Sequence, residues 1–363
     1  MLGHLNMAEK EISLKDNSET EIYEVACPDD EYAFLHEAAI IEYHGTLFAA
    51  WYNCEEKELI GPTPIRQKRS KDGGKTWSDI ETVAEDQTGK ILFCPPVYGI
   101  CEDKLYMLIN EMVSADHIHA LDLYVFQEEK DCFEFLWSKP IPFKLNTNVY
   151  KMANGKLLLP GRIAELDGFP NTPAVIISDS GQMDDDWRLV YIQENGDLPD
   201  GSKLVHPEIT AIIEDNKIAM FSRDDERKVP LVYLSQDYGE TWSDAFSYDI
   251  PFSDSKIYAG TLSDGRNYII GNWYPGREKL VLVFSKPKEN TFETGGVGAM
   301  HCHPHTQVTY IVSGRYRFTI GDETREVGPG DTLLKQDGVM HGCVCLEGGV
   351  MLDFFTPMRE DFV

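Results

Sequence analysis

The chain has 363 residues, of which 42% are hydrophobic and 26% charged, a composition that suits a globular protein with a sizeable core. Its 33 basic and 61 acidic residues give a formal net charge of −28. Such a surface repels phosphate backbones and anionic lipids, so the charge argues against nucleic-acid and membrane-surface partners.

The N-terminal sequence, MLGHLNMAEKEIS, lacks the apolar core of a signal peptide, and no stretch of the chain reads as a transmembrane segment. The eight cysteines are scattered and contain no CxxC pair, which argues against a zinc ribbon or a dithiol redox motif. We therefore expect a cytoplasmic protein with reduced thiols.

A repeat runs through the first 290 residues. SKDGGKTWSD (70–79) and SQDYGETWSD (235–244) both fit S-x-D-x-G-x-T-W, and weaker echoes end at Trp137 and Trp187. The four tryptophans are 50 to 60 residues apart, and Phe292 continues the spacing. A period of this length exceeds that of helical-pair solenoids and is typical of a four-stranded propeller blade.

Each unit between the tryptophans contains two apolar strands joined by a tight turn, as in AAIIEYHGTLFAAWY (38–52) and EITAIIEDNKIAMFSR (208–223). The turns consist of Asn, Asp, Glu, His and Gly residues, several of which tolerate the positive φ of two-residue hairpins. No apolar period of 3.6 residues is evident, so the pattern predicts an all-β protein.

The S-x-D-x-G-x-T-W motif resembles the Asp box of the sialidase-like propellers, and the resemblance covers residues 1–291. It implies six blades, of which five are recognisable. In such a box the Asp accepts backbone N–H bonds across a turn and the Trp packs between sheets, so these residues are structural. The arginine of the R-I-P motif of true sialidases is absent, because HEAAII (36–41) stands at that place.

Candidate ligand-binding residues lie where the innermost strands of a propeller approach its axis. A guanidinium presents two parallel donors to a carboxylate, and the sialidase resemblance implies arginines in that role. The expected substrate-binding residues are Arg66, Arg162, Arg223 and Arg277. Glu208 is expected as a catalytic carboxylate, and the pair that glycoside hydrolysis needs would be drawn from Glu208, Glu37 and Asp225. The sequence gives no separation between these groups, so retaining and inverting chemistry both stay open.

From residue 292 the pattern changes to short alternating strands with glycine turns, which is typical of a jelly roll. His301 and His303 are two residues apart and would face the same side of a strand. Gln307 begins the next apolar strand, and His341 comes from a distant one. These four side chains offer three imidazoles and an amide oxygen, a ligand set that suits Zn, Ni, Mn or Fe(II).

The spacings H-x-H-x₃-Q-x₆-G and G-x₅-Q-x-G-x₂-H resemble the paired cupin motifs, and HCHPHTQVTYIVSG with LDFFTPMREDF resembles the single-domain pectin-degradation cupins. Those proteins convert 4,5-unsaturated uronates into linear ketouronates. The resemblance places metal ligands at His301, His303, Gln307 and His341. It also implies that Asp353 moves the proton, that Phe355 packs on the sugar and that Arg359 binds the carboxylate.

Such cupins carry more strand before the first histidine than this chain does, so we expect a truncated cupin over residues 292–363. Residues 278–285 or a partner subunit would supply the front strands, and an uncovered sheet would favour a homodimer through the cupin.

Three functions remain open. The first is an acidic-sugar catabolic protein, in which a metal-dependent cupin acts on uronates beside a propeller that binds carboxylated mono- or oligosaccharides. The second is an exo-sialidase-type glycosidase with an accessory cupin. The third is a non-catalytic sugar-binding or sensing protein, because cupins also serve as ligand-binding modules.

Overall fold

The structure, a computed structural model, describes residues 21–356 except 115–116, 164–170, 194–197, 199–200, 249, 253, 264, 286–289 and 293. All regular elements in the described residues are β-strands, which confirms the all-β prediction. No helix in this part of the chain is long and apolar enough to cross a membrane. The chain forms two compact units, one of residues 1–259 and 270–281 and the other of residues 260–269 and 282–363.

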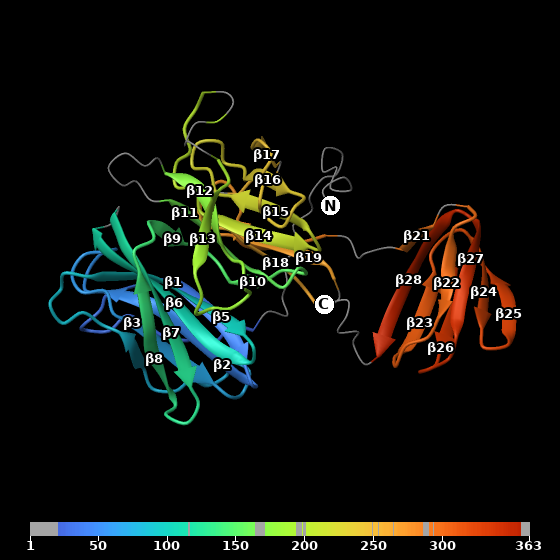
Figure 1. Cartoon of the computed structure of the whole chain (residues 1–363), viewed down its shortest axis with the longest axis horizontal. Coiled ribbons are helices and arrows are strands. Elements are labelled where there is room, and N and C mark those ends of the chain that lie inside the picture. The colour runs from blue at the N-terminus through green and yellow to red at the C-terminus, as the bar shows by residue number, and fades with distance from the viewer. Residues whose placement is uncertain are drawn as a thin grey trace. The chain divides into compact units, whose positions relative to one another are not determined.

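Five antiparallel sheets follow one another between residues 34 and 284 (Figure 1). The first contains β1 (Phe34–Tyr43), β2 (Thr46–Cys54), β3 (Ile65–Ser70) and β4 (Glu81–Ala84). The second contains β5 (Leu92–Cys101), β6 (Lys104–Ser114), β7 (His117–Gln127) and β8 (Cys132–Lys139). In both sheets, strands adjacent in sequence are adjacent in space, as expected for propeller blades.

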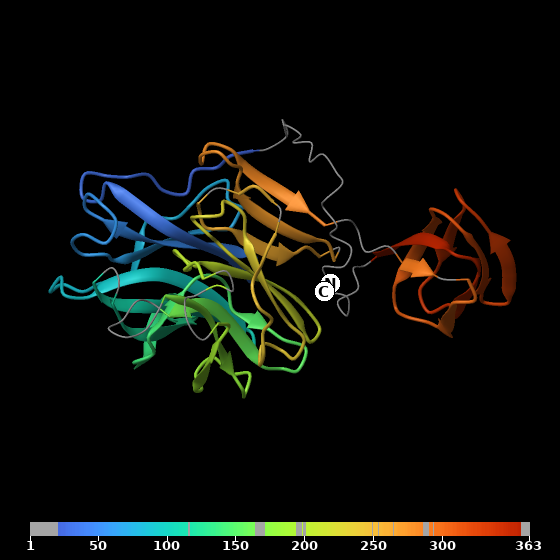
Figure 2. The same cartoon turned by 90° about the horizontal axis from the view of Figure 1, so that it is seen from above.

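The third sheet has the order β10 (Tyr150–Lys151), β11 (Leu157–Ile163), β12 (Thr172–Ser178) and β13 (Trp187–Tyr191), and β9 (Phe143–Leu145) also pairs with β11. The fourth contains β14 (Ile209–Glu214), β15 (Lys217–Ser222), β16 (Leu231–Ser235) and β17 (Phe246–Ser247). The fifth has three strands, β18 (Tyr258–Thr261), β19 (Asn267–Asn272) and β20 (Leu280–Phe284). Figure 2 shows the first four sheets succeeding one another around a centre.

The hairpin turns form where the sequence predicts them. His44 and Gly45 have φ values of 48° and 75°, and Glu102 and Asp103 have 49° and 58°. Two successive residues with positive φ are the signature of a type I′ turn, whose twist matches that of the strands it joins.

The two complete S-x-D-x-G-x-T-W motifs form the same turn. In the first, the Asp72 carboxylate accepts bonds from the Thr76 amide and hydroxyl at 2.9 and 2.6 Å, and Trp77 Nε1 donates to the Gly74 carbonyl at 2.9 Å. Asp237 and its neighbours repeat these bonds in the second. The hydrogen bonds that both carboxylates accept close turns of the backbone, which agrees with a structural role.

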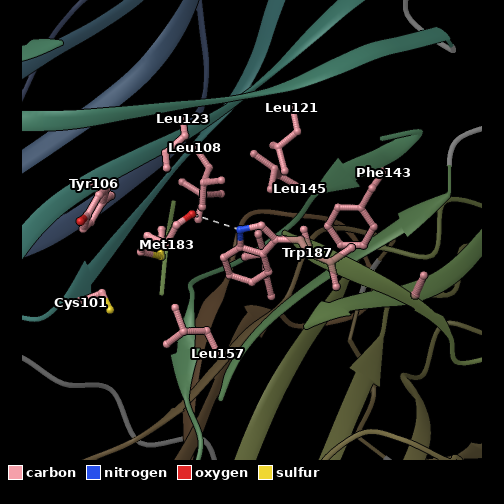
Figure 3. Close-up of a cluster of buried hydrophobic side chains, with 14 of the residues drawn as sticks. Cys101, Tyr106, Leu108, Leu121, Leu123, Phe143, Leu145, Leu157, Met183 and Trp187 are labelled. Carbon is pink, nitrogen blue, oxygen red and sulfur yellow. Dashed lines mark hydrogen bonds between the residues drawn. The ribbon is translucent and has the colours of Figure 1, made fainter. Parts of the chain in front are cut away.

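Trp187, at one of the weaker echoes, lies in the core between the second and third sheets (Figure 3). Only 7% of it is exposed, and its Nε1 donates to the Met183 carbonyl at 3.2 Å. Leucines of the second sheet and apolar side chains of the third surround it: Leu108, Leu121, Leu123, Phe143, Leu145 and Leu157. The repeat therefore marks positions where large rings fill the space between neighbouring sheets.

Residues 290–356 form two further four-stranded sheets. One has the order β21 (Asn290–Phe292), β28 (Gly349–Thr356), β23 (Thr306–Ile311) and β26 (Thr332–Lys335). The other has the order β22 (Val297–His301), β27 (His341–Glu347), β24 (Arg315–Ile320) and β25 (Glu323–Val327). Buried Tyr316, Phe318, Ile311, Leu333 and Met351 form a core between them. This arrangement is a short jelly roll.

One of the two sources that we expected for the front strands, residues 278–285, does not pair with the jelly roll. β20, which lies within residues 278–285, pairs with β19 in the fifth sheet. β21 and β22 instead pair with β28 and β27, so each sheet reaches four strands with residues from 290 onwards.

The buried carboxyl of Asp122 on β7 should make the stability of the folded chain depend on pH. It is 1% exposed, and its Oδ1 has no hydrogen-bond partner within the described residues. Burial, reinforced by Glu111 and opposed by a bond from Ser138, raises the pKa of this carboxyl to about 7. The folded chain therefore holds a proton that the unfolded chain releases near pH 4, and the free energy of unfolding falls as pH rises between these values.

We expect Asp122→Asn to remove this dependence, because the amide stays neutral. The free energy of unfolding of Asp122→Asn should exceed that of the wild type by at most about 4 kcal/mol above about pH 8 and by little below about pH 5. Urea unfolding at both pH values measures it, with the exposed Asp79→Asn as control. Parallel pH profiles for wild type and Asp122→Asn would contradict the prediction.

Candidate functional site

Three imidazoles converge within the jelly roll. His301 ends β22, His341 begins β27, and the two are paired in register. His303 follows His301, and one nitrogen of each of the three rings lies within 4.8 Å of the others. His303 and His341 are buried, whereas His301 is exposed, so the cluster lies at the mouth of the barrel rather than in its core.

Gln307, the first inward-facing residue of β23, completes the cluster. Its Oε1 lies 3.1 Å from Nε2 of His303 and 3.1 Å from Nε2 of His341. Its Nε2 donates to Asp353 Oδ1 at 2.6 Å and to Thr309 Oγ1 at 3.3 Å. Because these two acceptors fix the amide orientation, the oxygen of Gln307 must point towards the imidazoles.

The other nitrogen of each ring fixes its tautomer. Nδ1 of His301, His303 and His341 bonds to the backbone carbonyls of Ala299, His305 and Val339 at 2.8, 3.1 and 2.8 Å. A carbonyl only accepts, so each Nδ1 carries the proton and each neutral ring keeps a lone pair on Nε2. Burial, with the charges of Lys335 and the other two histidines, also lowers the pKa of His341 and favours its neutral form.

These residues fit a divalent transition metal. The lone pairs of His303 and His341 face Gln307 Oε1, which is also an acceptor, and such an arrangement is repulsive unless a cation or a proton lies between the atoms. The outer hydrogen bonds to carbonyls and to Asp353 are those that orient metal ligands in proteins. The structure thus brings together all four predicted ligands, His301, His303, Gln307 and His341.

Asp353 lies directly behind Gln307 on β28. Its carboxylate also accepts a bond from the Thr309 hydroxyl, and Lys335 Nζ lies 3.7 Å away. Lys335 is 2% exposed, donates to Thr309 Oγ1 at 2.5 Å and lies over the Phe318 ring. Burial lowers the pKa of Lys335, against the opposing effect of Asp353. A lysine at an inward strand position breaks the apolar alternation, a signal that sequence reasoning missed.

Two of the predicted cupin residues cannot be placed in full. The backbone of Phe355 pairs with Gln307 in register, but its side chain lies outside the described residues. Arg359 also lies outside them. The roles expected for both stay predictions.

Two of the predicted propeller arginines are bound to their own surroundings. Arg66 lies over the Tyr32 ring, with Glu31 at 3.4 Å and Asp29 at 3.9 Å, and so ties the N-terminal segment to β3. Arg277 is exposed and donates to the Asp254 carbonyl. Neither guanidinium joins the cluster described next.

Arg223 and Glu208 belong to a charged cluster that involves several sheets. Arg223 binds Glu208 at 2.7 Å and Asp225 at 2.6 Å, and Asp225 also contacts His206 at 2.8 Å. Lys256 Nζ lies 3.9 Å from Glu208. The predicted catalytic carboxylate is therefore already held by two cations.

Lys256 links this group to Glu37 of β1. Its Nζ lies 2.9 Å from Glu37 Oε1, and Cys94 Sγ donates to Glu37 Oε2 at 3.1 Å. Burial would raise the pKa of Glu37, but Lys256 and Lys144 outweigh it and hold that pKa well below its usual range. Burial and the adjacent Glu37 raise the pKa of the Cys94 thiol, so it stays protonated.

Two nitrogens of Arg162 on β11, Nε and Nη1, are buried without a hydrogen-bond partner in the described part of the chain. Nε of Arg66 is also unsatisfied, but the Arg66 guanidinium has Glu31 and Asp29 beside it. Sequence reasoning selected Arg162 but missed Cys94, Lys144 and Lys256, which belong to no motif. Their shared position offers a signal, because each lies on the first strand of a sheet or two residues before it.

Comparison with known proteins agrees with both parts of the architecture. The family model of the BNR repeat-like domain matches residues 45–310, and that of the cupin domain matches residues 289–354. The pectin degradation protein KdgF of Dickeya dadantii is 38% identical over 114 residues, which are 31% of this chain and 96% of that protein.

Two solved structures share the fold. A Dyadobacter fermentans protein of unknown function superposes with a TM-score of 0.55 at 11% identity, over 88% of this chain and 97% of that one. A Hadza microbial sialidase superposes with a TM-score of 0.57 at 12% identity, over 70% of this chain and 57% of that one. These similarities confirm a sialidase-like propeller followed by a cupin.

Proposed function

Because the chain belongs to the BNR repeat-like domain family, and its cupin part to the family of the pectin degradation protein KdgF, we propose that it acts in acidic-sugar catabolism, its cupin converting 4,5-unsaturated uronates into linear ketouronates. One observation carries the proposal. The Gln307 amide joins the histidine cluster to the Asp353 carboxylate, so a ligand set and a proton-transfer group meet in one place.

The reaction is an isomerisation, so no atom is gained or lost. The proton of the anomeric hydroxyl leaves and the bond between C-1 and the ring oxygen breaks. The ring oxygen becomes the C-5 carbonyl oxygen, and C-4 receives a proton. A divalent metal held by His301, His303, Gln307 and His341 would supply Lewis acidity towards a substrate oxygen.

Asp353 is the group proposed to move the proton. It accepts bonds from Gln307 and Thr309 and has Lys335 at 3.7 Å, so its carboxylate is fixed in position beside the ligand set. A carboxylate held in this way can take a proton from the substrate hydroxyl and return it to carbon.

We expect Asp353→Asn to keep the metal and to lose at least about 100-fold in kcat/KM, because general acid–base catalysis contributes a factor of that order. Ultraviolet absorbance of the conjugated double bond follows turnover, and elemental analysis gives the metal content. Glu323→Gln, an exposed substitution on β25, serves as control. Wild-type turnover by Asp353→Asn would refute the assignment of this residue, and no turnover by metal-loaded wild type would refute the reaction.

A second candidate function, glycoside hydrolysis by the propeller, is favoured by Glu37 and Glu208. Both carboxylates lie against Lys256 Nζ, at 2.9 and 3.9 Å, so these two oxygens are at most 6.8 Å apart. Such a separation allows a pair of catalytic carboxylates. Chromogenic sialosides and uronides, tested with wild type and Glu37→Gln, decide this function. Equal rates for the two proteins would exclude it.

A further inference from the structure

A lysine lies inside the jelly roll, at a position where the alternation of the strand calls for an apolar residue. Lys335 ends β26 and is the register partner of Gln307 on β23, so the two side chains leave the same face of the sheet. It is 2% exposed and is the only lysine from residue 290 onwards. Lysines are almost never fully buried unless they are paired, so the reason for this one lies with its neighbours.

Thr309, Asp353 and Phe318 lie around the ammonium of Lys335. Its Nζ donates to Thr309 Oγ1 at 2.5 Å, and it lies 3.7 Å from Asp353 Oδ1 and 4.9 Å from the centre of the Phe318 ring. An ammonium has donors and no acceptor, so the Thr309 oxygen accepts from it and the single hydroxyl proton goes to Asp353. Lys335 therefore holds Asp353 in two ways, by its charge and through the Thr309 hydroxyl.

The Gln307 amide lies between Asp353 and the histidines. Its Nε2 donates to Asp353 Oδ1 at 2.6 Å, while its Oε1 lies 3.1 Å from Nε2 of His303 and of His341. A divalent cation among neutral imidazoles attracts a carboxylate more strongly than an amide oxygen, because only the carboxylate carries a charge. The amide oxygen nevertheless faces the histidines, and the carboxylate is bonded on the side of Thr309 and Lys335.

We propose that Lys335 is a positioning residue of the metal centre, which holds the Asp353 carboxylate behind Gln307 and outside the ligand set. This inference rests on the metal centre of the proposed function and not on the reaction assigned to it. With Lys335 in place, the ligands are three imidazoles and a neutral amide, and the carboxylate stays available to accept a proton. Without Lys335, the carboxylate would be drawn towards the bound cation.

Two measurements on the full chain test this role. Competition with a chromophoric chelator gives the affinity for Zn(II), and the visible absorption of the Co(II)-loaded chain reports the ligand set. Lys335→Met keeps the length of the side chain and removes its charge. It should bind Zn(II) at least about tenfold more tightly than wild type, because a repelling charge is lost and a carboxylate ligand is gained. For the second reason its Co(II) spectrum should also differ from that of wild type.

Arg317→Met is the matched control. Arg317 lies in the same compact unit and is also paired with a carboxylate, that of Glu326 at 2.9 Å, but its side chain is 51% exposed. Water and salt screen such a charge, so the Zn(II) affinity and the Co(II) spectrum should stay those of wild type. In an Asp353→Asn background, Lys335→Met should no longer change the Co(II) spectrum, since no carboxylate is left to move.

Equal or weaker Zn(II) binding by Lys335→Met, or an unchanged Co(II) spectrum, would overturn the proposal. A role in packing alone predicts weaker binding together with a lower melting temperature. If Lys335→Met does not fold, Lys335→Gln replaces it with the same expected results, because it keeps a donor towards Thr309 without the charge. Neither measurement uses a uronate, so a lack of turnover by metal-loaded wild type would refute the reaction and leave this test decisive. A wild type that binds no metal would refute the metal centre and this role together.

Discussion

The His341→Ala protein is expected to lose its bound metal and, with it, uronate conversion. His341 supplies one of the three converging ring nitrogens, and its Nε2 faces the Gln307 oxygen at 3.1 Å. Loss of an outer hydrogen bond to a ligand costs about 10- to 100-fold in metal affinity. Loss of a ligand itself should therefore cost more than about 100-fold, and turnover should fall with it.

Elemental analysis after reconstitution with Zn, Ni, Mn or Fe(II) measures this loss, beside the absorbance assay. His305→Ala is the matched control, because the carbonyl of His305 accepts from His303 while its ring is outside the converging three. It should retain about one equivalent of metal. If His341→Ala and wild type retained equal metal, or if His305→Ala lost it equally, the ligand set would be wrong.

Strand periodicity explains part of the predicted histidine cluster. Two histidines two residues apart face one way on a strand. The distant third, His341, was predicted from the resemblance to the paired cupin motifs. Thr309 follows from the same rule, since it faces inward two residues after Gln307. Lys335 does not, because a buried lysine is compatible with a strand only when specific partners surround it, here Thr309 and Asp353.

The propeller shows the limit of such reasoning. Arg66, Arg162, Arg223 and Arg277 all occupy similar places in their repeats, yet only Arg162 lacks a partner among the described residues. What distinguishes them is the local supply of carboxylates and carbonyls, which comes from other strands and leaves no trace in the spacing. β21 was not predicted as a strand for a different reason. It has only three residues, too few for alternation to be recognised.

Among the tryptophans of the propeller repeat, Trp187 is the one at which we expect a large loss of stability on substitution. Trp187→Ala should lower the free energy of unfolding by about 3–5 kcal/mol, because it leaves a cavity between the second and third sheets that close-packed neighbours cannot fill. The lost bond from Nε1 leaves the Met183 carbonyl without this donor and adds to the cost. Trp187→Phe fills most of the space and should cost less.

Urea unfolding followed by far-ultraviolet circular dichroism measures these differences. Phe135→Ala on β8 is the control, because that ring is 54% exposed and its removal opens no buried cavity. The metal content of Trp187→Ala gives a second readout, since the histidine cluster lies in the other compact unit. At a temperature where the propeller remains folded, the metal content of Trp187→Ala should equal that of the wild type. A loss of stability no larger than that of Phe135→Ala would mean that the sheets repack around the missing ring. Trp187 would then not be the principal contact between the second and third sheets, and the regular tryptophan spacing would reflect only the repetition of the sequence.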